Sequence, residues 1–171
     1  MTSLFLSYDY KTDEYWRVRF LDVYAGEFNV KIYNPQDFQA QTGEEYITYL
    51  VENGILTVED VVVVLVGPRT YSMRKVDWDI SAALTKKGMR PSGLIAMRLP
   101  THDDHGKNTI NPRRVPTRLV ENIKSGYVKI QDWVESEQEM QSRYYQALKD
   151  AREKAAKIKN NRPLMAQDMF R

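Results

Sequence analysis

The segment at residues 60–67 constrains the fold more than any other part of the chain. It reads DVVVVLVG, and its apolar run from Val61 to Val66 contains five valines. β-branched residues favour strands, and an unbroken apolar strand is typical of a parallel sheet covered by helices on both faces. The run therefore predicts the central strand of an α/β domain.

Shorter strands and amphipathic helices alternate around this central strand. The other predicted strands lie at 4–7, 29–34, 94–97 and 126–133. The predicted helices carry apolar stripes at Trp16, Phe20, Leu21 and Tyr24, at Tyr46, Ile47, Leu50 and Val51, and in a third segment from about Asp77 to Lys87. This alternation predicts a parallel sheet of about five strands with right-handed crossovers.

The C-terminal third has a different composition and pattern. Residues 100–116 form a polar, proline-punctuated loop, and a capping box at Ser136–Glu139 predicts a helix that runs to about Asn160. We expect an α/β domain at 1–135, with a C-terminal helix and tail at 136–171 packed on the same domain. The tail ends in the apolar sequence PLMAQDMF, so a helix- or tail-mediated homo-oligomer is the alternative.

Composition excludes several classes of protein. The chain has no cysteine, which excludes disulfides and thiolate chemistry and fits a cytoplasmic location. The apolar run at the N-terminus stops at Leu6, so we expect neither a signal peptide nor a membrane span. Residues 1–80 have a net charge of −6 and residues 81–171 of +8. The basic half either meets phosphates or is a solvated helix, and its pattern does not favour nucleic acid as a partner.

Two acids follow the central strand at the place where parallel sheets bind nucleotides. Asp77 and Asp79 flank Trp78 in the sequence KVDWDI, just after the strand and a short connection. Ligands of open parallel sheets bind beyond the carboxyl ends of the strands. The sequence lacks GxGxxG, so a Rossmann redox site is not indicated.

Three separated segments resemble, in the same order, the TIR-like proteins of bacterial Thoeris anti-phage systems. They read LFLSYDYKTDE at 4–14, KVDWDI at 75–80 and RVPTRLVENIKSGYVKIQDW at 114–133. The resemblance implies a flavodoxin-like TIR fold and an enzyme that cleaves NAD at the nicotinamide–ribose bond. The product would be a cyclic or modified ADP-ribose signal that activates a separate effector protein. NAD would be the substrate, with no further cofactor and no metal.

The resemblance implies that Asp79 carries the catalytic carboxylate, at a position where the family usually has glutamate. The alternative is an acid in the first turn of a helix, stabilised by the helix dipole. Asp77 is the fallback, although the helical turn aims it elsewhere. Lys75 stands where the family often has an aromatic residue, so it either meets a phosphate or marks a repurposed pocket.

The predicted NAD-binding residues lie at the end of the first strand and in its loop, and in the segment that follows the central strand. They are Phe5, Ser7, Tyr8, Asp9, Tyr71, Lys75 and Trp78. For Phe5 and Trp78 the alternative is core packing, and for Ser7 a local turn hydrogen bond. The loop at 33–43 corresponds to the segment that gates the pocket in TIR domains.

Two further groups of polar side chains are weaker candidates. His102 and His105 invite a metal site, although a solvated turn is favoured for both because no third ligand is evident. Four arginines either meet the NAD diphosphate or lie in surface loops, which is favoured for each: Arg98, Arg113, Arg114 and Arg118.

Two alternative functions remain open. A catalytically silent TIR-like module that binds a nucleotide or protein partner is consistent with the departures at Asp79 and Lys75. A phosphoacceptor switch on the same topology would need an acidic pair after the first strand and an aspartate at the end of the central strand. The central strand ends in Val66-Gly67-Pro68, which counts against this switch.

Overall fold

The computed structural model describes residues 2–169 and contains a five-stranded parallel sheet. Its strands are β1 (Ser3–Ser7), β2 (Asn29–Lys31), β3 (Asp60–Val66), β4 (Gly93–Arg98) and β5 (Ile130–Asp132). They lie in the order β2-β1-β3-β4-β5, and every neighbouring pair is parallel. This is the flavodoxin-like strand order, so the predicted fold class is confirmed.

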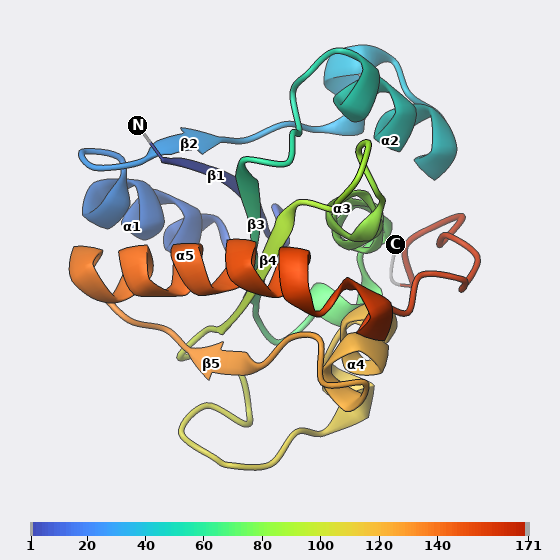
Figure 1. The fold of residues 1–171 in the computed structure, drawn as a ribbon. Coiled ribbons are helices and arrows are strands. Elements are labelled where there is room, and N and C mark those ends of the chain that lie inside the picture. The colour runs from blue at the N-terminus through green and yellow to red at the C-terminus, as the bar shows by residue number, and fades with distance from the viewer. Residues whose placement is uncertain (1, 170–171) are drawn as a thin grey trace.

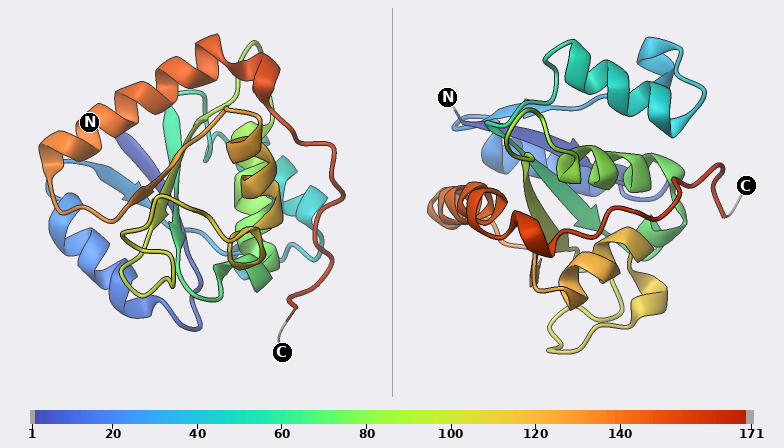
Figure 2. Two further views of the ribbon diagram at one scale, coloured as in Figure 1. Left: turned by 90° about the horizontal axis from the view of Figure 1, so that it is seen from below. Right: turned by 45° about the vertical axis from the view of Figure 1, so that its right-hand side comes forward.

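Helices cover both faces of the sheet (Figures 1 and 2). The α-helices are α1 (Glu14–Tyr24), α2 (Gly43–Glu52), α3 (Arg74–Leu84), α4 (Thr117–Lys124) and α5 (Glu137–Glu153). Short 3₁₀ helices are η1 (Pro35–Phe38), η2 (Thr70–Ser72), η3 (Pro112–Arg114) and η4 (Ala155–Lys157). Helices α1 and α5 lie on one face, and α2, α3 and α4 lie on the other (Figure 2).

The alternation of side chains along β3 divides the core in two. Val62, Val64 and Val66 belong to the cluster beneath α2, α3 and α4. Val61 and Val63 belong to the cluster beneath α1 and α5. Every residue of β3 is buried, as predicted for a central strand between two helical layers.

Several element boundaries differ from the prediction. β2 ends at Lys31 rather than residue 34, β5 has only three residues, and α5 ends at Glu153 rather than near Asn160. α4 was not predicted, because no element was assigned between the polar loop that ends at residue 116 and the strand expected at 126–133. No helix in the described part of the chain is long and apolar enough to cross a membrane.

Helix α3 begins at Arg74, three residues before the predicted start. Its N-cap residue, Met73, makes no side-chain capping bond. The backbone N–H of Arg74 instead donates to Oδ1 of Asp168, over 2.9 Å, from the far end of the chain. A tertiary contact therefore replaces the local N-cap on which sequence-based prediction depends. In consequence, Asp79 lies in the second turn of the helix and not in the first.

Candidate functional site

The carboxylate of Asp79 is the centre of a buried polar cluster. The side chain is wholly buried. Its Oδ2 accepts a hydrogen bond of 2.6 Å from Ser7 Oγ and lies 2.7 Å from Lys75 Nζ. Its Oδ1 accepts a hydrogen bond of 2.6 Å from the Tyr46 hydroxyl. Two donors and one cation therefore satisfy a charge that would be costly to bury alone.

Three different elements bring these side chains together. Ser7 is the last residue of β1, so its side chain lies at the carboxyl edge of the sheet. Tyr46 comes from the first turn of α2, which packs beside α3. Lys75 and Asp79 are four residues apart in α3, a spacing that places them on the same helix face. The cluster thus lies at the edge where parallel sheets bind ligands.

The electrostatics of the cluster keep the Tyr46 hydroxyl protonated. Burial raises the pKa of Tyr46 well above its ordinary value of 10.0, and the negative charge of Asp79 raises it further. The phenol is therefore a donor to Asp79 at any physiological pH. The Lys75 ammonium makes no well-formed hydrogen bond among the described residues, so its interaction with Asp79 is mainly that of opposite charges.

An aromatic pair adjoins the cluster. The Lys75 ammonium lies 5.9 Å from the centre of the Phe5 ring. The ring of Phe5 is stacked on that of Tyr33, with centroids 6.0 Å apart and an interplanar angle of 18°. Tyr33 follows β2 and is half-buried, so this stack connects the buried carboxylate to the loop at 33–43.

The structure brings only part of the predicted NAD-binding set to Asp79. Ser7 contacts it directly, as does Lys75, and Phe5 lies next to Lys75. Tyr8 faces the opposite helical layer, where its hydroxyl donates to Glu14 over 3.3 Å. Burial raises the pKa of Tyr8 to about 12.

Asp9, another member of the predicted set, has a local role. Asp9 accepts hydrogen bonds from Lys11 N and Thr12 Oγ1, and so closes the turn after β1. Tyr71 lies in η2 before α3 and is half-buried.

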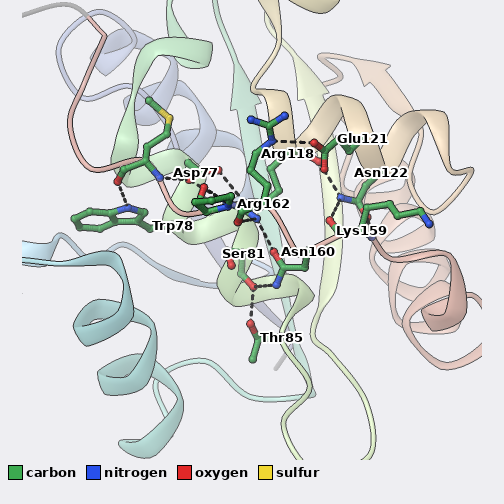
Figure 3. A network of polar contacts seen from close by, with 12 residues as sticks. Asp77, Trp78, Ser81, Thr85, Arg118, Glu121, Asn122, Lys159, Asn160 and Arg162 are labelled. Carbon is green, nitrogen blue, oxygen red and sulfur yellow. Dashed lines mark hydrogen bonds and ion pairs between the residues drawn. The ribbon is translucent and has the colours of Figure 1, made fainter.

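Trp78 and Asp77 contact the C-terminal tail (Figure 3). The indole Nε1–H of Trp78 donates to the backbone oxygen of Met165 over 2.8 Å. Asp77 accepts from Met165 N over 2.9 Å and forms an ion pair with Arg118, with Nε 2.8 Å from Oδ1. Asp77 therefore points away from the Asp79 cluster. The tail up to residue 169 docks on its own domain. Phe170 lies outside the described residues.

The structure corrects the predicted exposure of two arginines. Arg118 is fully buried, and Arg98 is 4% exposed. Arg98 Nε lies 2.7 Å from Asp132 Oδ1. Each guanidinium binds a carboxylate and backbone oxygens, so neither lies in a surface loop. Arg113 and Arg114 are exposed.

His102 is also buried rather than solvated. Its Nε2 bonds to the backbone oxygen of Arg114 over 2.9 Å, and its Nδ1 accepts from Asp104 N over 3.0 Å. Both ring nitrogens thus organise the loop at 100–116. His105 is exposed. Within residues 2–169, no group of three or more potential metal ligands was found.

Sequence reasoning missed Tyr46 as a partner of Asp79. Tyr46 was predicted as part of an apolar helix stripe, and it does pack in the core. Its hydroxyl, however, needs a buried acceptor. A tyrosine among purely aliphatic positions was the one sign in the sequence that this stripe faces a polar group.

Asp13, at the start of α1, provides a pH-dependent prediction. Its carboxylate packs against Gly67, where any side chain would collide with it. Burial, with a smaller contribution from the charge of Asp9, raises the pKa of Asp13 from 3.8 to about 6. Between pH 3.8 and 6 the unfolded chain releases this proton while the folded chain retains it. The contribution of Asp13 to stability therefore falls as pH rises, and the penalty is complete above pH 6.

We expect Asp13→Asn to stabilise the fold at pH 7 by about 2 kcal/mol, because the amide avoids burying a charge. The stabilisation by Asp13→Asn should become smaller below pH 6 and reach its minimum below pH 4. Urea unfolding of both proteins at pH 3.5, 5 and 7 measures the difference directly. A gain that does not change with pH would contradict this assignment.

Together the strand order and the buried carboxylate at the carboxyl edge define a TIR-like α/β domain. Residues 5–104 match the family model described as Thoeris protein ThsB, TIR-like domain. Because the match covers more than half of the chain, the protein belongs to this family. No curated protein and no solved structure gave a match. Family membership points to a role in Thoeris defence, with partner effectors.

Proposed function

We propose that this protein is an NAD-cleaving enzyme of Thoeris defence. It would break the nicotinamide–ribose bond and convert the ADP-ribose moiety into a cyclic or modified signal for an effector. The observation that carries this proposal is the Asp79 carboxylate, on which β1, α2 and α3 converge at the carboxyl edge of the sheet. Family membership supports the same reaction.

The chemistry requires a fixed negative charge beside the ribose. Nicotinamide departs with the electron pair of the C1′–N bond and leaves an oxocarbenium-like ribose. A carboxylate stabilises this cation, as in glycoside hydrolysis. A hydroxyl of the same ADP-ribose, or water, then attacks C1′ and releases a proton. In this mechanism Asp79 supplies the charge, and Ser7 and Tyr46 hold its two oxygens in place.

Lys75 has two opposing effects in this mechanism. Its ammonium balances the charge of the buried Asp79 carboxylate, but it also neutralises part of the charge that the ribose cation would need. With the ribose bound, the ammonium must move away from Oδ2 or turn towards another anion. The diphosphate of NAD is the anion that the substrate itself supplies.

One observation favours the silent binding module as a second candidate. Asp79 has no exposed surface, and its partners satisfy both carboxylate oxygens. A carboxylate that is held closed permanently would serve the fold rather than catalysis. The NAD-cleaving enzyme and the silent binding module thus differ in whether the polar cluster around Asp79 opens to admit a ligand.

NAD turnover by the purified protein tests the proposal. Chromatography with mass spectrometry should detect nicotinamide and a new product derived from ADP-ribose. Asp79→Asn keeps the shape of the side chain but removes the charge, so we expect a loss of at least about 100-fold. Asp60→Asn is the matched control, since Asp60 is also buried and pairs with Lys31 over 3.0 Å, but at the amino end of β3. It should keep its turnover.

Asp79→Glu separates the two candidate functions. Glutamate is the residue usual in the family at this position. If the native protein is inert, even with lysate from infected cells added, and Asp79→Glu releases nicotinamide, the silent module is the correct function. Equal turnover by the native protein and Asp79→Asn would exclude Asp79 as the catalytic carboxylate.

A further inference from the structure

The last described residues form an irregular segment that crosses the N-terminal half of α3, next to the candidate site. We call residues 159–169 the C-terminal strap. It leaves η4, runs between α4 and α3, and ends near the carboxyl ends of the strands (Figure 2). Apart from isolated turns and bends it has no regular secondary structure. It also lies outside the residues that match the family model.

The first part of the strap is anchored on α4 (Figure 3). The side chain of Asn122 donates to Lys159 O and accepts from Lys159 N, over 2.8 Å and 2.9 Å. Arg118 donates to the side chain of Asn160 and to the backbone oxygen of Pro163. The strap therefore helps to bury Arg118.

The middle of the strap is anchored on α3 and α2. Met165 bonds through its N–H to Asp77 and through its oxygen to Trp78. Leu164 packs against Gly43, the first residue of α2. A Cβ built on Gly43 would lie 2.7 Å from both Leu164 Cδ1 and Trp78 Nε1. The strap thus closes directly on the helix that carries Tyr46.

The end of the strap spans the carboxyl edge of the sheet. Asp168 accepts the hydrogen bond from Arg74 N and lies 3.4 Å from the Lys11 ammonium. Met169 N donates to Ser72 O over 2.9 Å. Lys11 belongs to the loop after β1, whereas Ser72 and Arg74 precede and begin α3. The strap therefore bridges the two segments between which a ligand of this fold would enter.

More than half of the residues of the strap are exposed to solvent. Its residues 161–163, 166, 167 and 169 are exposed, and the ammonium of Lys11 is itself partly in solvent. Most of its contacts are single hydrogen bonds, without the ladder of a helix or sheet. Segments with few buried apolar contacts open at the lowest free-energy cost. The strap can therefore leave while the sheet and α3 remain folded.

We propose that the C-terminal strap is an autoinhibitory lid over the Asp79 site. This inference rests on the proposed function, because it assigns the regulation of that same site. The observation behind it is that Asp79 is sealed and that the strap fastens the α2, α3 and β1 segments which enclose it. Release of Asp168 frees the Arg74 N–H and the Lys11 ammonium. Both groups are suited to the diphosphate of an entering dinucleotide.

Two substitutions loosen the strap from opposite sides. Asp168→Lys places a cation next to Lys11 and removes the cap of Arg74. Gly43→Ala pushes against Leu164 and Trp78 without changing the tail. Gln167→Lys is the matched control, because Gln167 is exposed and the same new cation there leaves the anchors intact.

Amide hydrogen exchange measured by NMR reports opening of the strap independently of chemistry. We expect exchange at Met165 to become roughly tenfold faster in Asp168→Lys and Gly43→Ala. It should be unchanged in Gln167→Lys. Exchange at Val63 in β3 reports global stability and should change much less. Nicotinamide release should rise roughly tenfold in the same two variants, in parallel with opening.

The outcomes separate the lid from the chemistry. Unchanged exchange at Met165 in both variants overturns the lid. If the native protein releases nicotinamide, faster exchange with turnover no higher than native in both variants also overturns it. If no form releases nicotinamide, changes in the NMR chemical shifts of the Ser7 and Tyr46 amides on adding ADP-ribose test the lid instead. Chemical-shift changes seen only in the loosened variants support the lid and overturn NAD cleavage. If no variant shows such changes, the lid is overturned.

Discussion

Arg118→Ala should lower the free energy of unfolding by about 3–5 kcal/mol, the usual cost of breaking a buried ion pair from one side. The guanidinium has no exposed surface and forms an ion pair with Asp77. It also donates to Asn160 and to the backbone oxygens of Arg162 and Pro163. Its removal would leave the Asp77 carboxylate buried without its cation and would detach the start of the strap.

Urea denaturation followed by circular dichroism measures this loss. Arg113→Ala is the control, since Arg113 is exposed, and it should change stability by no more than about 0.5 kcal/mol. The double change Asp77→Ala with Arg118→Ala should cost less than the sum of the single changes, because no charge then remains buried alone. A cost below about 1 kcal/mol for Arg118→Ala would show that water reaches Asp77 readily.

The second large effect is expected at the catalytic candidate itself. Asp79→Ala should destabilise the protein by about 3–5 kcal/mol. Lys75 is 4% exposed, and its buried ammonium would remain without a counter-charge. The hydroxyls of Ser7 and Tyr46 would lose their acceptor in the same place. Loss of activity in Asp79→Ala would therefore mix loss of chemistry with loss of fold.

A double-mutant cycle resolves this mixture. Lys75→Met combined with Asp79→Ala removes both charges, and the pair should be more stable than Asp79→Ala alone by about 1–3 kcal/mol. Asp60→Ala is the comparison, because its partner Lys31 has a side chain that is 22% exposed and can turn towards water. It should cost less than Asp79→Ala. Equal stabilities for Asp79→Ala and the double variant would show that Lys75 is not held by this charge.

The pattern of apolar residues was sufficient to predict the fold. The valine run of β3 and the alternation of strands and helices depend on side chains close together in the sequence, so local periodicity reveals them. The capping box at Ser136–Glu139 likewise predicted the start of α5, where Ser136 Oγ accepts from Glu139 N. The same local patterns also predicted that Asp79 follows the central strand.

The partners of the charged residues could not be predicted in this way. Ser7 and Tyr46 reach Asp79 across 72 and 33 residues, and Trp78 reaches Met165 across 87. The start of α3 was misplaced because its cap is Asp168, 94 residues away. Arg118 and His102 looked exposed because polar side chains usually are, and only a folded partner makes their burial tolerable.

The sequence by itself determined the sheet, four of its five α-helices and the element on which the candidate carboxylate lies, because burial of apolar surface follows a local period. Only the tertiary structure decided that Asp79 is enclosed, that Asp77 pairs with Arg118 and that the tail fastens over α3. Hydrogen bonds and ion pairs depend on distances of about 3 Å between atoms, and the chain sets those distances only once it has folded.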